Sequence, residues 1–381
     1  MPTSSLLAPR REAGRCDLRE RRLSRFHSRV QDAVRGLAVR HTRMADLAVS
    51  FPALLFALAV PRPGFDVAPA LARVIEGRPL AEAARAADLP MWLRKLRPEA
   101  FVRPIARLPD GELFRRQIAN HLPRSPKLAP AWLQVVADMS ELSHDEAAIW
   151  IAREFARDAP RRVNVARLRL IGLWAWFSLQ PATFAHELID RRWTPDVRVN
   201  AALEGADNWR TMIELHLDLG RDPIADMWLQ AGRVSGYDFR PLDSIAAIAE
   251  EADAMRNCLR TYGYSLAHNF ARLWSVRRDG ERIATLRVAT ANRDPLPRIV
   301  ELKGAGNTQV PRELWWAARR WLHTHDLLQI DMGRRRRDTA PLDLATWLAL
   351  WRPYWLAKRR IPMWLPIAPS RAALDALRAD A

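Results

Sequence analysis

The sequence has little cysteine and no long apolar run. Its 381 residues include only Cys16 and Cys258, too few for a disulfide framework or a zinc cluster, so we expect a reducing, cytoplasmic setting with no metal and no cofactor. The longest apolar run, 49–60, is well short of the roughly 20 residues that cross a bilayer. It predicts a buried core helix and no transmembrane segment. Arg10 and Arg11 follow the start without an apolar stretch, so no signal peptide is expected.

Lysine is also scarce, and arginine supplies almost all of the positive charge. Lysine occurs only at positions 95, 127, 303 and 358, whereas Lys and Arg together number 60 against 43 acids, a net charge of +17. Guanidinium groups bind phosphate through paired hydrogen bonds, which suits a nucleic-acid partner. The same bias suits an arginine-rich, high-GC coding background.

Helical patterns and breaks divide the chain into four predicted segments of an α+β protein. Residues 1–45 carry eleven arginines against four acids and predict a basic amphipathic helix, which either contacts nucleic acid or presents an ordinary solvated face. Residues 46–240 repeat helical patterns broken by proline and glycine, so one all-helical domain is expected there, as part of a mostly helical N-terminal domain. A small α-β-β-β-α module over 241–325 and an Arg/Trp-rich helical tail over 326–381 follow.

One part of the helical domain has the pattern of a helix-turn-helix. Apolar positions over 80–87 form one face, Pro90 makes a break, and residues 92–96 restart the pattern beside Arg94. A DNA-reading helix presents such basic residues to a major groove, and two packed helices of a bundle give the same pattern. The commoner bundle is favoured.

Within the module the apolar period changes from helical to two. Residues 244–262 predict a helix that stops at Gly263. Strands over 271–278 and 281–289 flank Asp279-Gly280, a pair that a type I′ turn prefers. That turn would place four pairs opposite each other: Arg278 and Glu281, Val276 and Ile283, Trp274 and Thr285, and Leu273 and Leu286.

A third strand, a glycine loop and a helix complete the module. The strand, 298–303, has two predicted faces: Val300 and Leu302 on the packed one, and Ile299, Glu301 and Lys303 on the charged one. Gly304 and Gly306 lie in the loop before a helix opened by Pro311, where they either cradle an anion or make a plain tight connection. The loop lacks the lysine and hydroxyl of a P-loop.

Three motifs of the module follow one another in order: MRNCLRTYG at 255–263, RRDGERIATLRV at 277–288 and VELKGAGN at 300–307. This order resembles the PcfJ-like family, found in bacteria and mobile elements, over roughly 248–323. That family usually has His-Cys-Val and a nearby Tyr at the helix end, a Thr in the middle strand and Gln-x-x-Gly-x-x-Asn in the last. This chain keeps Cys258, Tyr262, Thr285, Gly304 and Asn307, and it departs at Asn257 for the His and Glu301 for the Gln. The resemblance implies the module and a bacterial setting, and it implies no particular reaction.

Cys258 is a candidate nucleophile, with His268 as its base and Glu301 to orient that base. The alternative is a buried structural cysteine, since the position falls near a helix C-terminus, where the helix dipole disfavours a thiolate. His323 and His325 do not predict a metal site, because residues two apart on a helix point to different sides.

Four polar residues form the more promising group: Asn257, Tyr262, Glu301 and Asn307. They lie at element ends or on the charged face of the third strand. If they converge beside Gly304 and Gly306, they make a site for a ligand with donor and acceptor groups.

The tail has two basic clusters: Arg334, Arg335, Arg336 and Arg337, and then Lys358, Arg359 and Arg360. Tryptophans at helical spacing lie between them, a pattern typical of nucleic-acid or anionic-membrane contacts. Alternatively, the tryptophans dock on the module and the arginines are solvated. We expect non-enzymatic binding to nucleic acid or a nucleoprotein complex, and the alternatives are an enzyme with a site around Cys258, Glu301 and Asn307, or a helical scaffold for a protein partner.

Overall fold

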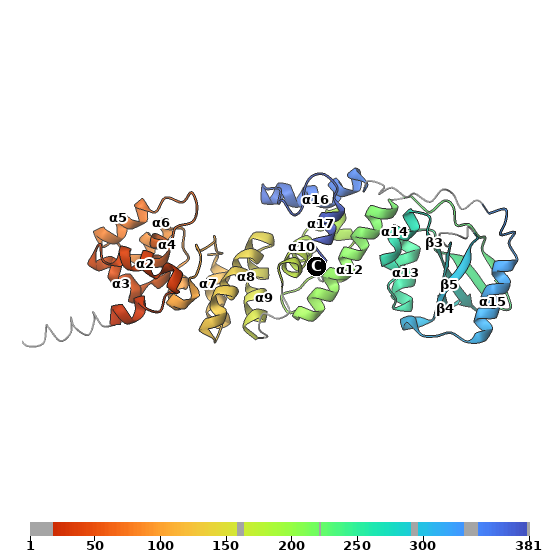
Figure 1. Ribbon diagram of the computed structural model, residues 1–381, viewed down its shortest axis with the longest axis horizontal. Coiled ribbons are helices and arrows are strands. Elements are labelled where there is room, and N and C mark those ends of the chain that lie inside the picture. The colour runs from red at the N-terminus through yellow and green to blue at the C-terminus, as the bar shows by residue number, and fades with distance from the viewer. Residues whose placement is uncertain (1–17, 158–163, 221, 291–295, 331–341, 379–381) are drawn as a thin grey trace, which may run out of the picture. The chain divides into compact units, whose positions relative to one another are not determined.

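The computed structural model describes residues 18–157, 164–220, 222–290, 296–330 and 342–378 (Figure 1). The chain divides into two units, one of Met1–Trp176 with Arg192–Leu203 and one of Phe177–Arg191 with Glu204–Ala381. The predicted fold class is confirmed, because helices fill the N-terminal part and an antiparallel sheet with further helices follows.

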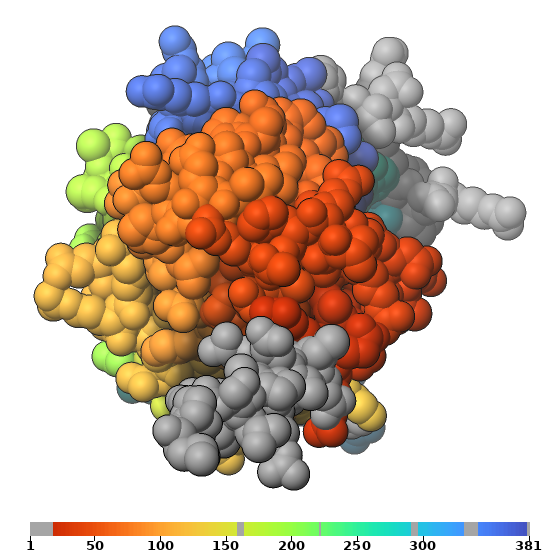
Figure 2. All heavy atoms as spheres, turned by 90° about the vertical axis from the view of Figure 1, so that its left-hand side faces the viewer, coloured from red at the N-terminus to blue at the C-terminus, as the bar shows by residue number. Residues whose placement is uncertain are grey.

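The first unit is helical, and one large apolar cluster joins buried residues from Leu23 to Phe155. The central helix α4 (Pro52–Ala59) begins with proline at a position that needs no backbone donor, and its residues 52–56 are all buried, as the apolar run predicts. Atoms of α2 to α6 form a closely packed surface (Figure 2, red and orange). The other helices of this part are α2 (Ser28–Ala38), α3 (Thr42–Ser50), α5 (Ala68–Glu76), α6 (Leu80–Ala86), η1 (Met91–Lys95), η2 (Pro98–Ala100), α7 (Glu112–Gln117), η3 (Ile118–His121), η4 (Pro126–Leu128), α8 (Ala129–Leu142), α9 (Asp145–Arg157) and most of α10 (Val165–Ser178).

The N-terminal amphipathic pattern is a packed face, although its helix is interrupted. Residues 18–23 are helical, a turn follows, and α2 begins after His27, whose ring accepts a hydrogen bond from the Arg29 amide at 3.3 Å. Phe26 and Val34 are buried in the core. The apolar stripe is therefore used for packing.

The DNA-reading alternative for residues 80–97 is wrong. After α6 the chain turns at Asp88, which has a φ of 51°, and only the single 3₁₀ turn η1 follows Pro90. Trp92 and Leu93 of that turn are buried. A 3₁₀ turn of five residues is too short to read a groove, so the segment serves packing.

The second unit carries a five-stranded antiparallel sheet in the order β1-β2-β3-β4-β5. Its strands β1 (Gly232–Val234) and β2 (Tyr237–Pro241) lie where only helices are predicted, because strands this short, joined by Ser235-Gly236, leave little alternating pattern. The remaining elements are α11 (Phe184–Glu187), most of α12 (Val199–Leu219), α13 (Ile245–Met255), η6 (Leu259–Tyr262), α14 (Gly263–Ala267), β3 (Ala271–Arg278), β4 (Glu281–Ala289), β5 (Arg298–Lys303), η7 (Ala305–Asn307), α15 (Arg312–His323), α16 (Leu344–Lys358) and α17 (Arg371–Asp375).

The predicted turn is confirmed, and the predicted register fails beyond it. Asp279 and Gly280 have φ values of 51° and 88°, the two positive angles of a type I′ turn, and Arg278 faces Glu281. A bulge then adds Ile283 to β4, so the pairs further from the turn differ by one residue from those expected. They are Val276 with Ala284, Ser275 with Thr285, Trp274 with Leu286, and Leu273 with Arg287.

A second bulge lies in β5, and it reverses the predicted faces of two neighbouring side chains. Arg287 faces Glu301, but Val288 faces Ile299, so Val300 is the extra residue. Val300 is 43% exposed, whereas Ile299 packs against the core, the reverse of the prediction. An added residue shifts the alternation of strand side chains by one, which no apolar pattern of six residues reveals.

The sheet is packed on both faces, by α15 on one and by α13 on the other (Figure 1). Trp321 of α15 stacks on Phe239 at 4.6 Å between ring centroids and meets Trp274 edge-on at 5.4 Å. On the face of α13, Leu273 packs with Ile248 and Leu259. The polar strand residues share this second face, which positions the site described below.

The tail helix α16 is packed within the second unit. Asp343 caps it by accepting a hydrogen bond from the Thr346 amide at 2.6 Å. Trp351 is buried, with its ring 6.0 Å from Phe177 and 6.1 Å from Trp209. Trp351 is therefore a core residue, and it packs against α10 and α12, which lie outside the module that one alternative predicted. Within the described ranges, no helix is long and apolar enough to cross a bilayer.

Two tryptophans of α15 give a direct test of this packing. Trp321→Ala should lower the free energy of unfolding of the sheet unit by about 3–5 kcal/mol, because it empties a buried ring site. Trp316→Ala, at a ring that is 64% exposed, should change it by less than about 0.5 kcal/mol. Amide hydrogen exchange of β2 and β3 measures both; equal effects of the two substitutions would contradict the packing.

Candidate functional site

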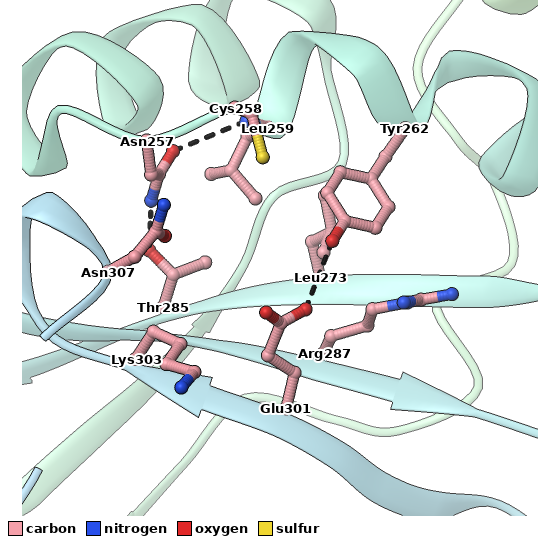
Figure 3. A pocket seen from close by; sticks show the side chains of 10 residues that line it. All are labelled: Asn257, Cys258, Leu259, Tyr262, Leu273, Thr285, Arg287, Glu301, Lys303 and Asn307. Atoms are coloured by element: carbon pink, nitrogen blue, oxygen red, sulfur yellow. Dashed lines mark hydrogen bonds between the residues drawn. The ribbon is translucent and has the colours of Figure 1, made fainter. Parts of the chain in front are cut away.

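A small hollow lies between η6 and the α13 face of the sheet, and all four residues of the predicted polar set line it (Figure 3). Its cavity volume is about 20 Å³, room for about one water molecule, and about 310 Å³ of atom-free space is reached only when the open solvent at its mouth is counted. The lining residues come from four parts of the module: Asn257, Cys258, Leu259 and Tyr262, then Leu273, then Thr285 and Arg287, and then Glu301, Lys303 and Asn307.

An early helix end places Asn257 and Cys258 at the hollow. Helix α13 stops at Met255 because Arg256 adopts the left-handed conformation with a φ of 48°, and the predicted stop at Gly263 is wrong. The Asn257 carbonyl oxygen of the side chain then accepts a hydrogen bond from the Leu259 amide at 3.3 Å. This bond starts η6 and turns the chain across the sheet.

Cys258 is exposed, and its sulfur points toward the sheet (Figure 3), so the prediction of a buried structural cysteine is wrong. The prediction fails because it places Cys258 inside a helix that has already ended.

A buried chain of hydrogen bonds fixes Asn257. Glu251 is fully buried and forms an ion pair with Arg282 at 3.0 Å. Its other oxygen accepts a hydrogen bond from the Thr285 hydroxyl at 3.1 Å, and that hydroxyl accepts one from the Asn257 side-chain amide at 3.2 Å. Each buried polar group in this series of hydrogen bonds has a partner. The series therefore fixes α13, β4 and the η6 turn relative to one another.

Tyr262 and Glu301 form the opposite wall of the hollow. The Tyr262 hydroxyl donates to Glu301 Oε2 at 3.0 Å, and the Arg287 guanidinium lies 4.8 Å from the centre of the tyrosine ring. Burial and then the Glu301 carboxylate raise the pKa of Tyr262, against an opposing effect of Arg287. The phenol therefore stays protonated at neutral pH and acts as a donor, not as a base.

The remaining polar groups of the hollow are available to a ligand. No hydrogen bond or ion pair joins the side chains of Lys303 and Asn307 to other described residues, and Glu301 Oε1 has none either. An ammonium and an amide thus face a carboxylate oxygen across one small space. Such a set recognises a molecule that has an acceptor or anionic group and a donor group.

The structure does not bring His268 into the hollow. Its Nδ1 is 2.9 Å from the Tyr264 carbonyl oxygen, and the residue is buried beside a second cleft with Asp218 and Arg272. The proposed base of Cys258 is therefore in another place.

The glycines of the loop shape it without lining the hollow. The Gly304 amide donates to the Thr308 carbonyl oxygen at 3.0 Å, and Gly306 adopts a φ of 63° in η7. Of the two predicted readings of the loop, this geometry is the tight connection, because in an anion nest the Gly304 amide would point outward to the anion. Only Asn307 of the loop lines the hollow.

The basic residues of the tail are divided between two cases. One cluster lies outside the described residues: Arg334, Arg335, Arg336 and Arg337. Its predicted contact with nucleic acid stays a prediction. Burial lowers the pKa of Lys358 to about 8, and its Nζ lies 6.0 Å from the Tyr354 ring. Arg359 and Arg360 are exposed at the end of α16.

Metal chemistry has no candidate in the described part of the chain, where no group of three or more His, Cys, Asp or Glu side chains could hold an ion. His325 Nε2 instead accepts a hydrogen bond from the Gln230 amide at 3.1 Å.

Comparison with known proteins finds no family model that matches the chain, and no similar curated protein or solved structure. The resemblance to the PcfJ-like family stays a prediction.

Sequence reasoning missed three members of this arrangement: Glu251, Arg282 and Arg287. A signal for Glu251 was present, since it falls three residues after Ile248 and four before Met255, on the buried row of α13. An acid on a buried row needs a partner, which predicts a basic residue on the facing strand. The position of Arg287 on the face of the hollow depends on the bulge at Ile283, and no residue pattern indicated that bulge.

The hydroxyl of Thr285 offers a test of the buried chain. Thr285→Val keeps the shape and leaves Glu251 and Asn257 without their shared partner, so it should lower the free energy of unfolding by about 1–3 kcal/mol. Thr285→Ser, which retains the hydroxyl, should cost less in urea denaturation. If both variants lose the same stability, the hydroxyl is not part of a stabilising chain.

The tyrosine wall predicts a pH dependence. Because the pKa of Tyr262 is raised above its ordinary value of 10.0, the folded protein keeps this proton longer than the unfolded chain does. The stability that this proton contributes is complete below about pH 10 and is lost as pH rises through the folded pKa. In a ¹³C-tyrosine NMR titration, Glu301→Gln should move the pKa of Tyr262 down, while Glu281→Gln leaves it in place; an unmoved pKa in Glu301→Gln would contradict the contact.

Proposed function

We propose that residues 248–323 form a PcfJ-like module of a bacterial, cytoplasmic protein, and that this module binds a small polar ligand in the hollow. One observation carries the proposal: residues from the three motifs, far apart in sequence, line the same small space (Figure 3). They include Asn257, Cys258 and Tyr262 from the first motif, Thr285 and Arg287 from the second, and Glu301, Lys303 and Asn307 from the third.

The charges of the hollow define the class of ligand. Lys303 and Asn307 supply donors to an anionic or carbonyl group, and Glu301 accepts from an amine, amide or hydroxyl. Leu259 and Leu273 supply an apolar wall. Because the cavity itself is only about 20 Å³, it admits one small polar group of the ligand, and the rest of the ligand lies at the open mouth.

Binding fits these residues better than nucleophilic chemistry at Cys258 does. A thiol nucleophile needs a base that accepts its proton, and the hollow offers an amide at Asn257 and a protonated phenol at Tyr262. Glu301 is the one carboxylate among the lining residues; its Oε2 accepts the Tyr262 hydroxyl, and no hydrogen bond joins its carboxylate to the Cys258 thiol. We therefore assign Cys258 to the wall of the site.

The test is an NMR titration of the full chain with a fixed panel: free amino acids, nucleosides, nucleotides and sugar phosphates. We expect one class to shift the amide signals of 257–262 and 301–307. Asn307→Ala should weaken that binding roughly 3- to 10-fold, the effect of a lost hydrogen bond, and Gln309→Ala, an exposed amide two residues away, should not.

Two results would overturn the proposal. One is that no member of the panel moves these signals at millimolar concentration, and the other is that Asn307→Ala and Gln309→Ala bind alike. Cys258→Ala separates binding from catalysis. If the variant keeps its affinity and mass spectrometry finds no reaction product in the unsubstituted protein that the variant lacks, the hollow is a binding site. A covalent adduct that forms only when the thiol is present would instead make the module an enzyme.

A further inference from the structure

The outer side of α15 presents an aromatic ring among arginines. Arg312, Trp316, Arg319, Arg320 and His323 are all exposed, and Trp316 is 64% exposed. At 100° per residue their positions fall within an arc of about 100° on the helix. The opposite side of α15 buries Leu314, Ala317, Ala318, Trp321 and Leu322 in the core, so this outer stripe adds nothing to packing.

The three arginines of this stripe have no partner among the described residues. No hydrogen bond or ion pair links Arg312, Arg319 or Arg320 to any residue in the described ranges. Some other arginines of the second unit do have partners, as Arg210 has in Asp207 and Glu214. Unpaired guanidinium groups can bind anionic groups, and the exposed indole ring between them can stack on an aromatic group. The surface therefore suits a partner that is both anionic and aromatic.

The spacing narrows the kind of partner. A rise of 1.5 Å per residue puts Trp316 about 6 Å along the axis from Arg312 and about 5–6 Å from Arg319 and Arg320. With this spacing, the ring can stack on one unpaired base while the guanidinium groups on either side of it contact the two phosphates that flank that base. In a duplex the bases are stacked on each other and give the indole no face.

We propose that the α15 stripe is a binding surface for single-stranded nucleic acid. Trp316 stacks on a base, and Arg312, Arg319 and Arg320 contact the flanking phosphates. This surface lies on the sheet face opposite the hollow and stands independently of the ligand proposed there, because α15 packs against Phe239 and Trp274 while the hollow is under η6. It also differs from the basic clusters of the tail.

The test measures anisotropy of a 5′-fluorescein-labelled 20-nucleotide poly-dT strand and of a mixed-sequence duplex of equal length. Trp316→Ala should weaken single-strand binding roughly 5- to 100-fold, the effect of losing one stacked base. The control Met363→Ala removes a side chain that is 98% exposed elsewhere and should leave affinity unchanged. The duplex should bind more weakly and respond little to Trp316→Ala.

A charge-matched pair of double variants tests the phosphate contacts. Arg319→Gln with Arg320→Gln should lower the slope of log affinity against log salt by about 1.4, since each lost contact to a single strand removes about 0.7. Arg85→Gln with Arg352→Gln removes equal charge at two exposed arginines of α6 and α16 and should leave the slope unchanged. Three results would overturn the proposal. They are an equal decrease of the salt slope in the two double variants, single-strand affinity that Trp316→Ala leaves unchanged, and no binding of either probe at low salt.

Discussion

The carboxylate of Glu251 is the constraint on which the arrangement of the module depends. It is completely buried, so it needs Arg282 on one oxygen and the Thr285 hydroxyl on the other. Thr285 in turn accepts the amide of Asn257, which holds the first residues of η6. A helix, a strand and a turn are thus fixed to one another by a single polar chain, and the hollow is the space left beside it.

The two faces of the sheet have different tasks. The face under α15 is an apolar and aromatic core built around Trp274 and Trp321, and it supplies rigidity. The face under α13 is apolar near Leu273 and polar toward β5, where Glu301 and Lys303 project. Because strand residues alternate between faces, the same strands support a core on one side and a ligand site on the other.

The sequence predicted the class of fold and much of the site, and its errors have local physical causes. Asp279-Gly280 identified the hairpin because only that turn needs two positive φ angles. The bulges at Ile283 and Val300 changed the register with no residue signal, and Arg256 took a left-handed conformation that usually marks glycine. The convergence of Asn257, Tyr262, Glu301 and Asn307 was a hypothesis from their element ends, and the hollow now brings them together.

The most direct test of this account is a double-mutant cycle between Glu251→Gln and Asn257→Ala, measured by urea denaturation. The two side chains bond the same hydroxyl and have no bond to each other. If one chain holds the turn, the two losses of stability should be non-additive, with a coupling energy of about 1 kcal/mol or more. Losses that add to within about 0.3 kcal/mol would show that Glu251 and Asn257 act independently, and the account of the hollow would then fail.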